Sequence, residues 1–156
     1  VGVAKGTLYY HFSSKEEIFN FLVEEGMKLL KNSIQIKTAK LDNSIDKIKA
    51  IILIQVKVLK KYENLITIVL SQIWGTEERN TTCRRYVMDY IKTVEKIIKE
   101  GIEKQEIIDM DSEVLASEIF ASTCTSLIYK MKTNQETDIK KMYTELETSV
   151  IKGIKR

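Results

Sequence analysis

Proline is absent from this sequence of 156 residues, and glycine occurs only six times. Because proline is common in turns and at strand edges, its absence favours long uninterrupted helices over a β-sandwich or barrel. Cysteine is also scarce: Cys83 and Cys124 show no CxxC or other metal-binding spacing, so we expect buried thiols and no disulfide. The longest apolar run, residues 50–54, is far shorter than the roughly 20 residues needed to cross a bilayer. With no signal-peptide pattern at its start, the sequence predicts a soluble, cytoplasmic protein that has no membrane partner.

The composition is that of a folded domain. Hydrophobic residues make up 44% of the chain and charged residues 30%, which excludes disorder of the whole chain. The net charge of +3 is small for a domain that binds nucleic acid over most of its surface. The positive charge has a local bias, because residues 1–15 contain Lys5 and Lys15 and no acidic residue.

Apolar residues recur at three- and four-residue steps almost from end to end, which is the period of an amphipathic helix. The pattern predicts a long helix from Ser14 to about Ile34, and further helices over residues 45–62, 65–74, 87–102, 115–131 and 139–150. Residues 65–74 are apolar on nearly every side, so we expect a central, buried helix there. Ser14 and Glu17 form a capping-box pattern, and polar residues at 42–44 and 109–112 can cap later helices. The predicted fold class is all-α.

The first twelve residues do not have the pattern of a core helix. At about 100° per residue, Leu8 and Phe12 share one face, while Gly6 and Tyr10 point almost the opposite way. The outward residues offer a cation, hydroxyls, aromatic edges and a glycine that allows close approach, which suit a phosphate-lined groove. Residues 2–16, GVAKGTLYYHFSSKE, strongly resemble the second half of the helix-turn-helix of TetR-family transcriptional regulators. The pattern of that family is approximately GV-S/A-K-G-T-L-Y-x-Y/H-F-x-S/N-K-E.

The resemblance implies a partial helix-turn-helix domain over residues 1–14, followed by an all-helical effector-binding and dimerisation domain over residues 15–156. Because the sequence starts in the turn of the motif, we expect it to lack the first two helices of the DNA-binding domain. Ala4 stands where many members have a capping serine. The implied partner is double-stranded operator DNA, contacted by Lys5, Gly6, Thr7, Tyr9, Tyr10, His11 and Lys15. As the alternative, His11 is a surface or core histidine, Tyr9 a partial core residue and Lys15 a solvated lysine.

The resemblance further implies a repressor that a small apolar effector, of fatty-acyl type, releases from its operator. The residues that could line an apolar cavity for this effector are Ile66, Leu70, Ile73, Trp74, Tyr90 and Phe120, with ordinary core packing as the alternative for each. A weaker likeness to the family is EGIEKQEI at residues 100–107, where Gln105 replaces the usual second glycine. We therefore expect this helix to end less sharply.

The last two helices are expected to pair with their copies in a homodimer, as the resemblance implies. Small side chains concentrated over residues 116–126 would let another helix approach closely, although a solvated Ser/Thr face is the alternative. The residues assigned to the interface are Ala121, Cys124, Leu127, Ile128, Met131, Tyr143, Leu146 and Val150.

Two functions of other classes compete with regulation. An enzyme is not expected, because the sequence has one histidine, no nucleophile motif, no glycine-rich phosphate loop and no metal-ligand spacing; no cofactor is expected either. Asp109 and Asp111 could hold a cation, but helix capping explains them better. The remaining alternative is a helical ligand- or protein-binding module that does not bind DNA in this truncated form. A full reading frame upstream would separate this alternative from a regulator.

Overall fold

The computed structural model describes residues 12–73, 80–133, 136 and 138–156, with the side chains of residues 71–73 and 80 left aside. The helices in this part of the chain are α2 (Lys15–Thr38), α3 (Ser44–Lys61), α4 (Glu63–Ile73), α5 (Asn80–Glu103), α6 (Ser112–Lys132) and α7 (Ile139–Ile154). The described residues form no sheet, and their only β-type pairing is an isolated bridge between Ile107 and Lys155. The predicted all-α fold class is confirmed.

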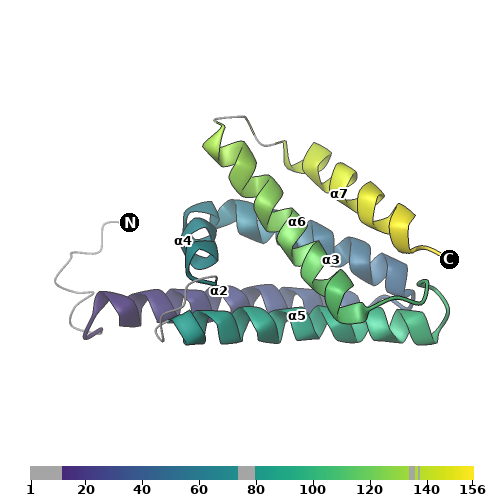
Figure 1. Cartoon of the computed structure of the whole chain (residues 1–156), viewed down its shortest axis with the longest axis horizontal. Coiled ribbons are helices and arrows are strands. Elements are labelled where there is room, and N and C mark those ends of the chain that lie inside the picture. Colours follow the sequence, from purple (N-terminus) through teal and green to yellow (C-terminus); the bar gives the residue numbers. More distant parts are fainter. Residues whose placement is uncertain (1–11, 74–79, 134–135, 137) are drawn as a thin grey trace.

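The helices form two layers (Figure 1). The long helices α2 and α5 lie side by side in one layer, and α3, α6 and α7 lie in the other, where α6 packs against both α5 and α3 and α7 packs mainly against α3. Helix α3 contacts α2, α5, α6 and α7, so it is the central helix of the molecule. Buried apolar residues from all six helices form one core cluster around it. None of the helices in the described ranges is both long enough and apolar enough to cross a membrane.

The prediction that residues 65–74 form the central, buried helix is wrong, because α4 is only partly buried and α3 is the central helix. Helix α4 buries Ile66 and Val69, but the side chain of Ile68 is 49% exposed. Helix α4 is the shortest of the described helices and stands at one end of the bundle, so neighbours cover only part of its surface (Figure 1). An all-round apolar sequence shows that burial is possible, but the neighbouring helices decide how much of the surface is covered.

The helix starts follow the capping chemistry expected from the sequence. Ser14 Oγ accepts a hydrogen bond from Glu17 N at 3.1 Å, and Asn43 and Asp111 cap α3 and α6 in the same manner. The carboxylate of Glu17 reaches back to the backbone N–H of Ser13 at 2.6 Å, one residue before the cap. Each cap satisfies backbone donors that the first turn of a helix leaves without a partner.

The end of α5 is sharper than expected. Gln105 adopts a left-handed backbone with φ of 59°, although it is not a glycine. The backbone N–H of Glu106 bonds to the carbonyl of Gly101 at 2.9 Å, and the N–H of Gln105 bonds to the carbonyl of Ile102 at 2.9 Å. These two bonds define a complete Schellman motif. The expectation of a less sharp end is therefore wrong, because the hydrogen bonds hold Gln105 in a conformation that glycine adopts more easily.

Glu106, the next residue, connects this turn to the central helix. Its carboxylate accepts a hydrogen bond from the backbone N–H of Ser44 at 2.6 Å, at the first turn of α3. This bond and the Ser44 side chain hold the pKa of Glu106 below its usual range. The turn after α5 thus anchors the start of α3.

Candidate effector cavity and DNA-contacting end

A cavity of about 410 Å³ lies between α4, α5 and α6. Helix α4 contributes Leu70 to its wall. The residues from the other two helices that line it are Val87, Met88, Ile91, Glu113, Val114, Ser117, Phe120, Ala121, Cys124 and Thr125. Val87 on α5 and Phe120 and Cys124 on α6 are buried, so they form the inner wall. Met88 and Val114 are 45% and 57% exposed, which places them where the cavity opens to solvent.

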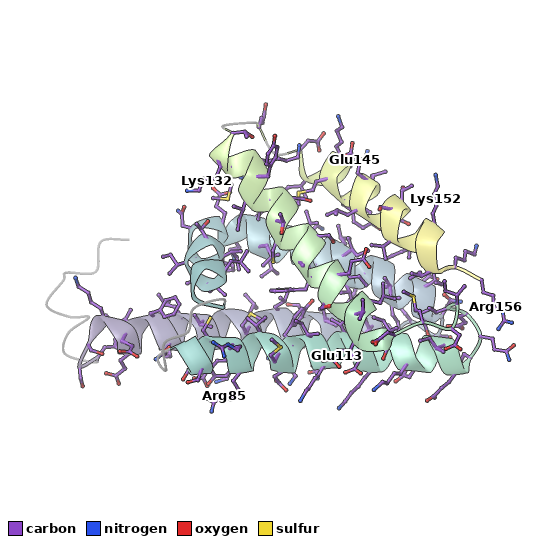
Figure 2. The ribbon with its side chains drawn as sticks, viewed as in Figure 1. Arg85, Glu113, Lys132, Glu145, Lys152 and Arg156 are labelled. Atoms are coloured by element: carbon purple, nitrogen blue, oxygen red, sulfur yellow. The ribbon has the colours of Figure 1, made fainter. Side chains whose placement is uncertain are left out.

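The cavity wall is mainly apolar and carries little charge. Ser117, Thr125 and the Cys124 thiol add weakly polar groups, and Glu113 is the one charged residue among the described residues of the lining. Figure 2 places Glu113 at the start of α6, beside α5. Burial raises the pKa of Cys124 to about 12, so this thiol is neutral at physiological pH. The arrangement suits an uncharged, aliphatic part of a ligand.

A buried polar network supports the inner wall from behind. Gln55 Nε2 donates to the Tyr90 hydroxyl at 2.5 Å, and Thr123 Oγ1 donates to Gln55 Oε1 at 3.0 Å. The rings of Tyr90 and Phe120 are tilted against each other with centroids 5.4 Å apart. Gln55, Tyr90 and Thr123 are at most 1% exposed, so these hydrogen bonds satisfy polar groups that water does not reach, and the Ile119 carbonyl is a second acceptor for Thr123 Oγ1 at 2.9 Å. The network fixes the position of Phe120 relative to α3 and α5.

The structure brings two of the six predicted cavity residues to this cavity, namely Leu70 and Phe120. Ile66 instead lines a narrow space of about 20 Å³ between α2, α3 and α4, and Tyr90 belongs to the buried network. The side chain of Ile73, and Trp74 entirely, lie outside the described residues. Tyr90 is the one residue of α5 in the predicted lining, and the α5 residues that do line the cavity, Val87, Met88 and Ile91, are not in it. The signal was present, because Val87 and Ile91 are spaced by four residues on the apolar stripe of α5.

The predicted DNA-contacting residues lie at the start of the chain. Lys5, Gly6, Thr7, Tyr9, Tyr10 and His11 are outside the described residues. Lys15 is exposed and is the first residue of α2, directly after the Ser14 cap. Phe12 is half-buried, and its ring packs against Phe21 of α2 with centroids 5.3 Å apart. This contact joins Phe12, which directly follows the predicted DNA-contacting residues, to α2.

Helix α5 connects the cavity with α2. On one side of α5, Val87, Met88 and Ile91 face the cavity. On the other side, Asp89 pairs with Lys31 of α2 at 2.6 Å. The Lys28 ammonium lowers the pKa of Glu24 most, and a hydrogen bond from Tyr86 of α5 lowers it further. Helix α5 therefore contacts both the cavity and the helix that begins at Lys15.

The residues assigned to the dimer interface divide into three groups. Cys124 and Leu127 are 1% and 0% exposed, so the core of the same chain already covers them. Ala121 is exposed and also lines the cavity. The half-buried residues at the α6–α7 surface are Ile128, Met131, Tyr143, Leu146 and Val150. Figure 2 shows that Lys132, Glu145 and Lys152 point outward from the same two helices.

Helix capping accounts for Asp111, whose Oδ1 accepts from Glu113 N at 2.9 Å and from Val114 N at 3.0 Å. The part of the chain that the structure describes contains no group of three or more histidine, cysteine, aspartate or glutamate side chains placed to hold a metal ion.

The fold is that of helical transcriptional regulators. A solved protein of Clostridium perfringens, described as a regulator of fatty acid metabolism, is 34% identical with a TM-score of 0.88; the match covers 97% of this chain and 82% of that one. FadR of Bacillus subtilis, a transcriptional regulator solved in complex with stearoyl-CoA, is 21% identical with a TM-score of 0.82 over 97% of this chain and 83% of that one. KstR2 of Mycobacterium tuberculosis, a ketosteroid transcriptional regulator, is 17% identical with a TM-score of 0.81 over 99% and 80%.

The sequence itself places the chain in a family. The profile of the bacterial regulatory proteins of the tetR family matches residues 1–22, which include the motif at the start of the chain. A search of curated proteins gives no match. Because the identity to the Clostridium perfringens protein is 34% over 97% of this chain, the chain belongs to the TetR family of transcriptional regulators.

Proposed function

We propose that this chain is a homodimeric repressor that leaves its operator DNA when an aliphatic effector of fatty-acyl type enters the cavity between α4, α5 and α6. The observation that carries the proposal is the apolar cavity of about 410 Å³, which opens to solvent beside Met88 and Val114. Two related structures support the effector class: one is described as a regulator of fatty acid metabolism, and the other holds stearoyl-CoA. In this proposal residues 1–14 contact DNA and residues 15–156 bind the effector and the second subunit.

The charge of the cavity favours a ligand whose anionic part stays outside. The described lining contains Glu113 and no cation, so a carboxylate or phosphate inside the cavity would lack a counter-charge. An aliphatic chain attached to a large polar group meets this requirement, because only its tail needs to enter. An acyl thioester of coenzyme A has this form.

Regulation requires that the effector have different affinities for the conformation that binds DNA and the conformation that does not. A tenfold loss of operator affinity corresponds to about 1.4 kcal/mol of coupling free energy, which is typical of allosteric proteins. The contacts between α5 and α2, Asp89 with Lys31 and Tyr86 with Glu24, would transmit the change. They lie within one helical turn of the cavity residues Val87, Met88 and Ile91.

Blocking the cavity tests the proposal. Ala121 is exposed and lines the cavity, so Ala121→Phe should fill the space without disturbing the core. We expect stearoyl-CoA to release the wild-type protein from an operator selected from random duplexes, and to have at least tenfold less effect on the variant. Operator affinity without ligand should stay within a few-fold, as measured by fluorescence anisotropy.

The matched control is Ala39→Phe, the same substitution at the exposed C-cap of α2. This variant should respond to stearoyl-CoA as the wild type does. If Ala121→Phe responds fully at the same ligand concentration, the effector binds elsewhere and the proposed cavity is wrong.

Lys15 provides a separate test of DNA contact. Its exposed side chain at the first position of α2 is expected to meet a phosphate. Lys15→Ala should weaken binding to all DNA sequences alike and lower the salt dependence by about one unit per subunit, hence about two per dimer. Lys40→Ala, an exposed lysine beyond the other end of α2, should leave both quantities unchanged. An unchanged salt dependence for Lys15→Ala would remove Lys15 from the DNA interface.

A further inference from the structure

A second hollow in the molecule lies outside the effector cavity. Its volume is about 480 Å³, and it runs over the outer face of α3 between α2 and α7. Helix α3 provides its floor with Ala50, Leu53 and Ile54, and Ile36 of α2 and Tyr143 of α7 form its two sides. We call this the α3 groove. Helices α4, α5 and α6, which enclose the effector cavity, contribute none of its described lining residues.

The groove combines an apolar floor with a positively charged rim. Lys49 and Lys57 lie on α3 on either side of Leu53, eight residues or about 12 Å apart, and Lys37 lies on α2. The ammonium group of Lys49 forms ion pairs with two carboxylates, those of Asp46 at 3.4 Å and Glu147 at 3.9 Å. Lys37 and Lys57 form no ion pair with the described residues. The rim therefore has positive charge that the surrounding chain does not neutralise.

The side and the floor of the groove both expose apolar surface to solvent. Ile36 is 68% exposed, the largest exposed fraction among the large apolar side chains of the described residues. Leu53 and Ile54 are half-buried beside it. A ligand that covers Ile36 and Leu53 would remove their apolar surface from water, and a negative charge on it would pair with the lysines of the rim.

From this juxtaposition we propose that the α3 groove is a binding site for a single-chain fatty carboxylate, separate from the effector cavity. The alkyl chain lies along Leu53, Ile54 and Ile36, and the carboxylate is bound by Lys57 and Lys37. Lysine ammonium groups are point charges suited to a compact head group. The described lining contains no arginine, the side chain whose planar fork matches phosphate bidentately. The proposal does not rest on the effector function and holds whether or not the cavity binds an acyl chain.

The test follows dodecanoate binding by NMR of the isoleucine and leucine methyl groups. Ile36, Leu53 and Ile54 report on the α3 groove, and Leu70 and Ile91 report on the effector cavity in the same spectrum. We expect saturable shifts of the groove methyls with dodecanoate. Neutral dodecyl maltoside and cationic dodecyltrimethylammonium, both kept below micelle formation, should bind the groove at least tenfold more weakly.

Charge variants identify the lysines. Lys37→Gln with Lys57→Gln should weaken dodecanoate binding in the groove about tenfold, because both ammonium groups that pair with the carboxylate are lost. Lys96→Gln with Lys104→Gln removes the same charge from exposed positions on and just after α5, and should change the affinity less than twofold. Ile36→Asn, at an exposed position, should also weaken binding without loss of folding.

Three results would overturn the proposal. The first is a set of groove methyls that do not shift when dodecanoate is added. The second is equal affinity for dodecanoate and dodecyl maltoside, which would show that charge has no role. The third is an equal effect of the two lysine pairs, which would reduce the role of Lys37 and Lys57 to net charge.

Discussion

At the residue scale, the largest fully buried side chain, Tyr90, has a polar group that must be satisfied inside the core. Its hydroxyl accepts the hydrogen bond from Gln55 Nε2, and Gln55 in turn accepts from Thr123. Burial raises the pKa of Tyr90 well above its usual range, so the phenol stays protonated. The three residues come from α5, α3 and α6, and the network joins these helices at one point.

Tyr90→Phe tests the contribution of this network. The variant keeps the ring that packs on Phe120 but leaves the Gln55 amide donor without its acceptor. A buried donor without a partner costs about 1–3 kcal/mol, so we expect the free energy of unfolding to fall by that amount. Urea denaturation measures the change.

The control is Tyr129→Phe, because Tyr129 is 63% exposed and its hydroxyl can bond to water. Its effect should stay within about 0.5 kcal/mol. Equal losses from the two substitutions would mean that the buried hydrogen bond adds nothing to stability.

At the scale of the element, α5 approaches the start of α3 through Gly101. A Cβ atom at this position would lie 2.7 Å from Ser44 Cβ and 2.5 Å from Ile107 Cδ1. The nearest Ile107 atom is the far end of a flexible side chain, but Ser44 Cβ is attached to the backbone at the first turn of α3. The close approach lets Glu106 reach the Ser44 N–H, so the glycine and the turn that follows it act together.

Gly101→Ala should therefore destabilise the protein. Alanine favours a helix over glycine by about 1 kcal/mol, but overpacking costs about 1–3 kcal/mol and requires α3 to shift. We expect a lower melting temperature. Gly153→Ala on α7 is the matched control, because a Cβ there meets no atom within 4 Å, and it should raise the melting temperature. Gly101→Ala with a melting temperature raised as much as that of Gly153→Ala would contradict the packing argument.

At the scale of the whole molecule, the fold leaves a surface on α6 and α7 that we propose as the contact with a second subunit. Cys124 and Leu127 are already buried in one chain, so the proposed contact uses Ile128, Met131, Leu146 and Val150. Tyr143 lines the α3 groove. A stable homodimer places two DNA-contacting ends about one helical turn of DNA apart, which a single chain cannot do.

Ile128→Lys tests this interface. A lysine there would place a charge in the apolar centre of the contact, so we expect a monomer by light scattering and a loss of operator binding. Circular dichroism should still show a helical protein. Ile36→Lys, at the exposed position on α2, should remain dimeric. A dimer that survives Ile128→Lys, or dissociates equally with Ile36→Lys, would place the interface elsewhere.

The local features of this fold could be predicted because they depend on neighbouring residues. The 3.6-residue period defined the helices, and Ser14, Asn43 and Asp111 marked helix starts through side chains that bond backbone donors two or three residues on. The motif at residues 2–16 identified the family for the same reason, since a short DNA-contacting segment has its pattern in consecutive residues.

Features that depend on contacts between distant residues were decided only by the tertiary structure. The apolar sequence of α4 predicted full burial, yet Ile68 is 49% exposed because the neighbouring helices cover only part of this helix. Gln105 adopted the left-handed turn because the backbone of α5 closes a Schellman motif around it, and the anchoring contact of Glu106 with Ser44 spans 62 residues of sequence. The cavity wall and the α3 groove each combine residues from three helices, whose relative rotation determines which side chains meet. Periodicity defines which face of a helix is apolar, but only packing decides which neighbour covers that face and where space is left for a ligand.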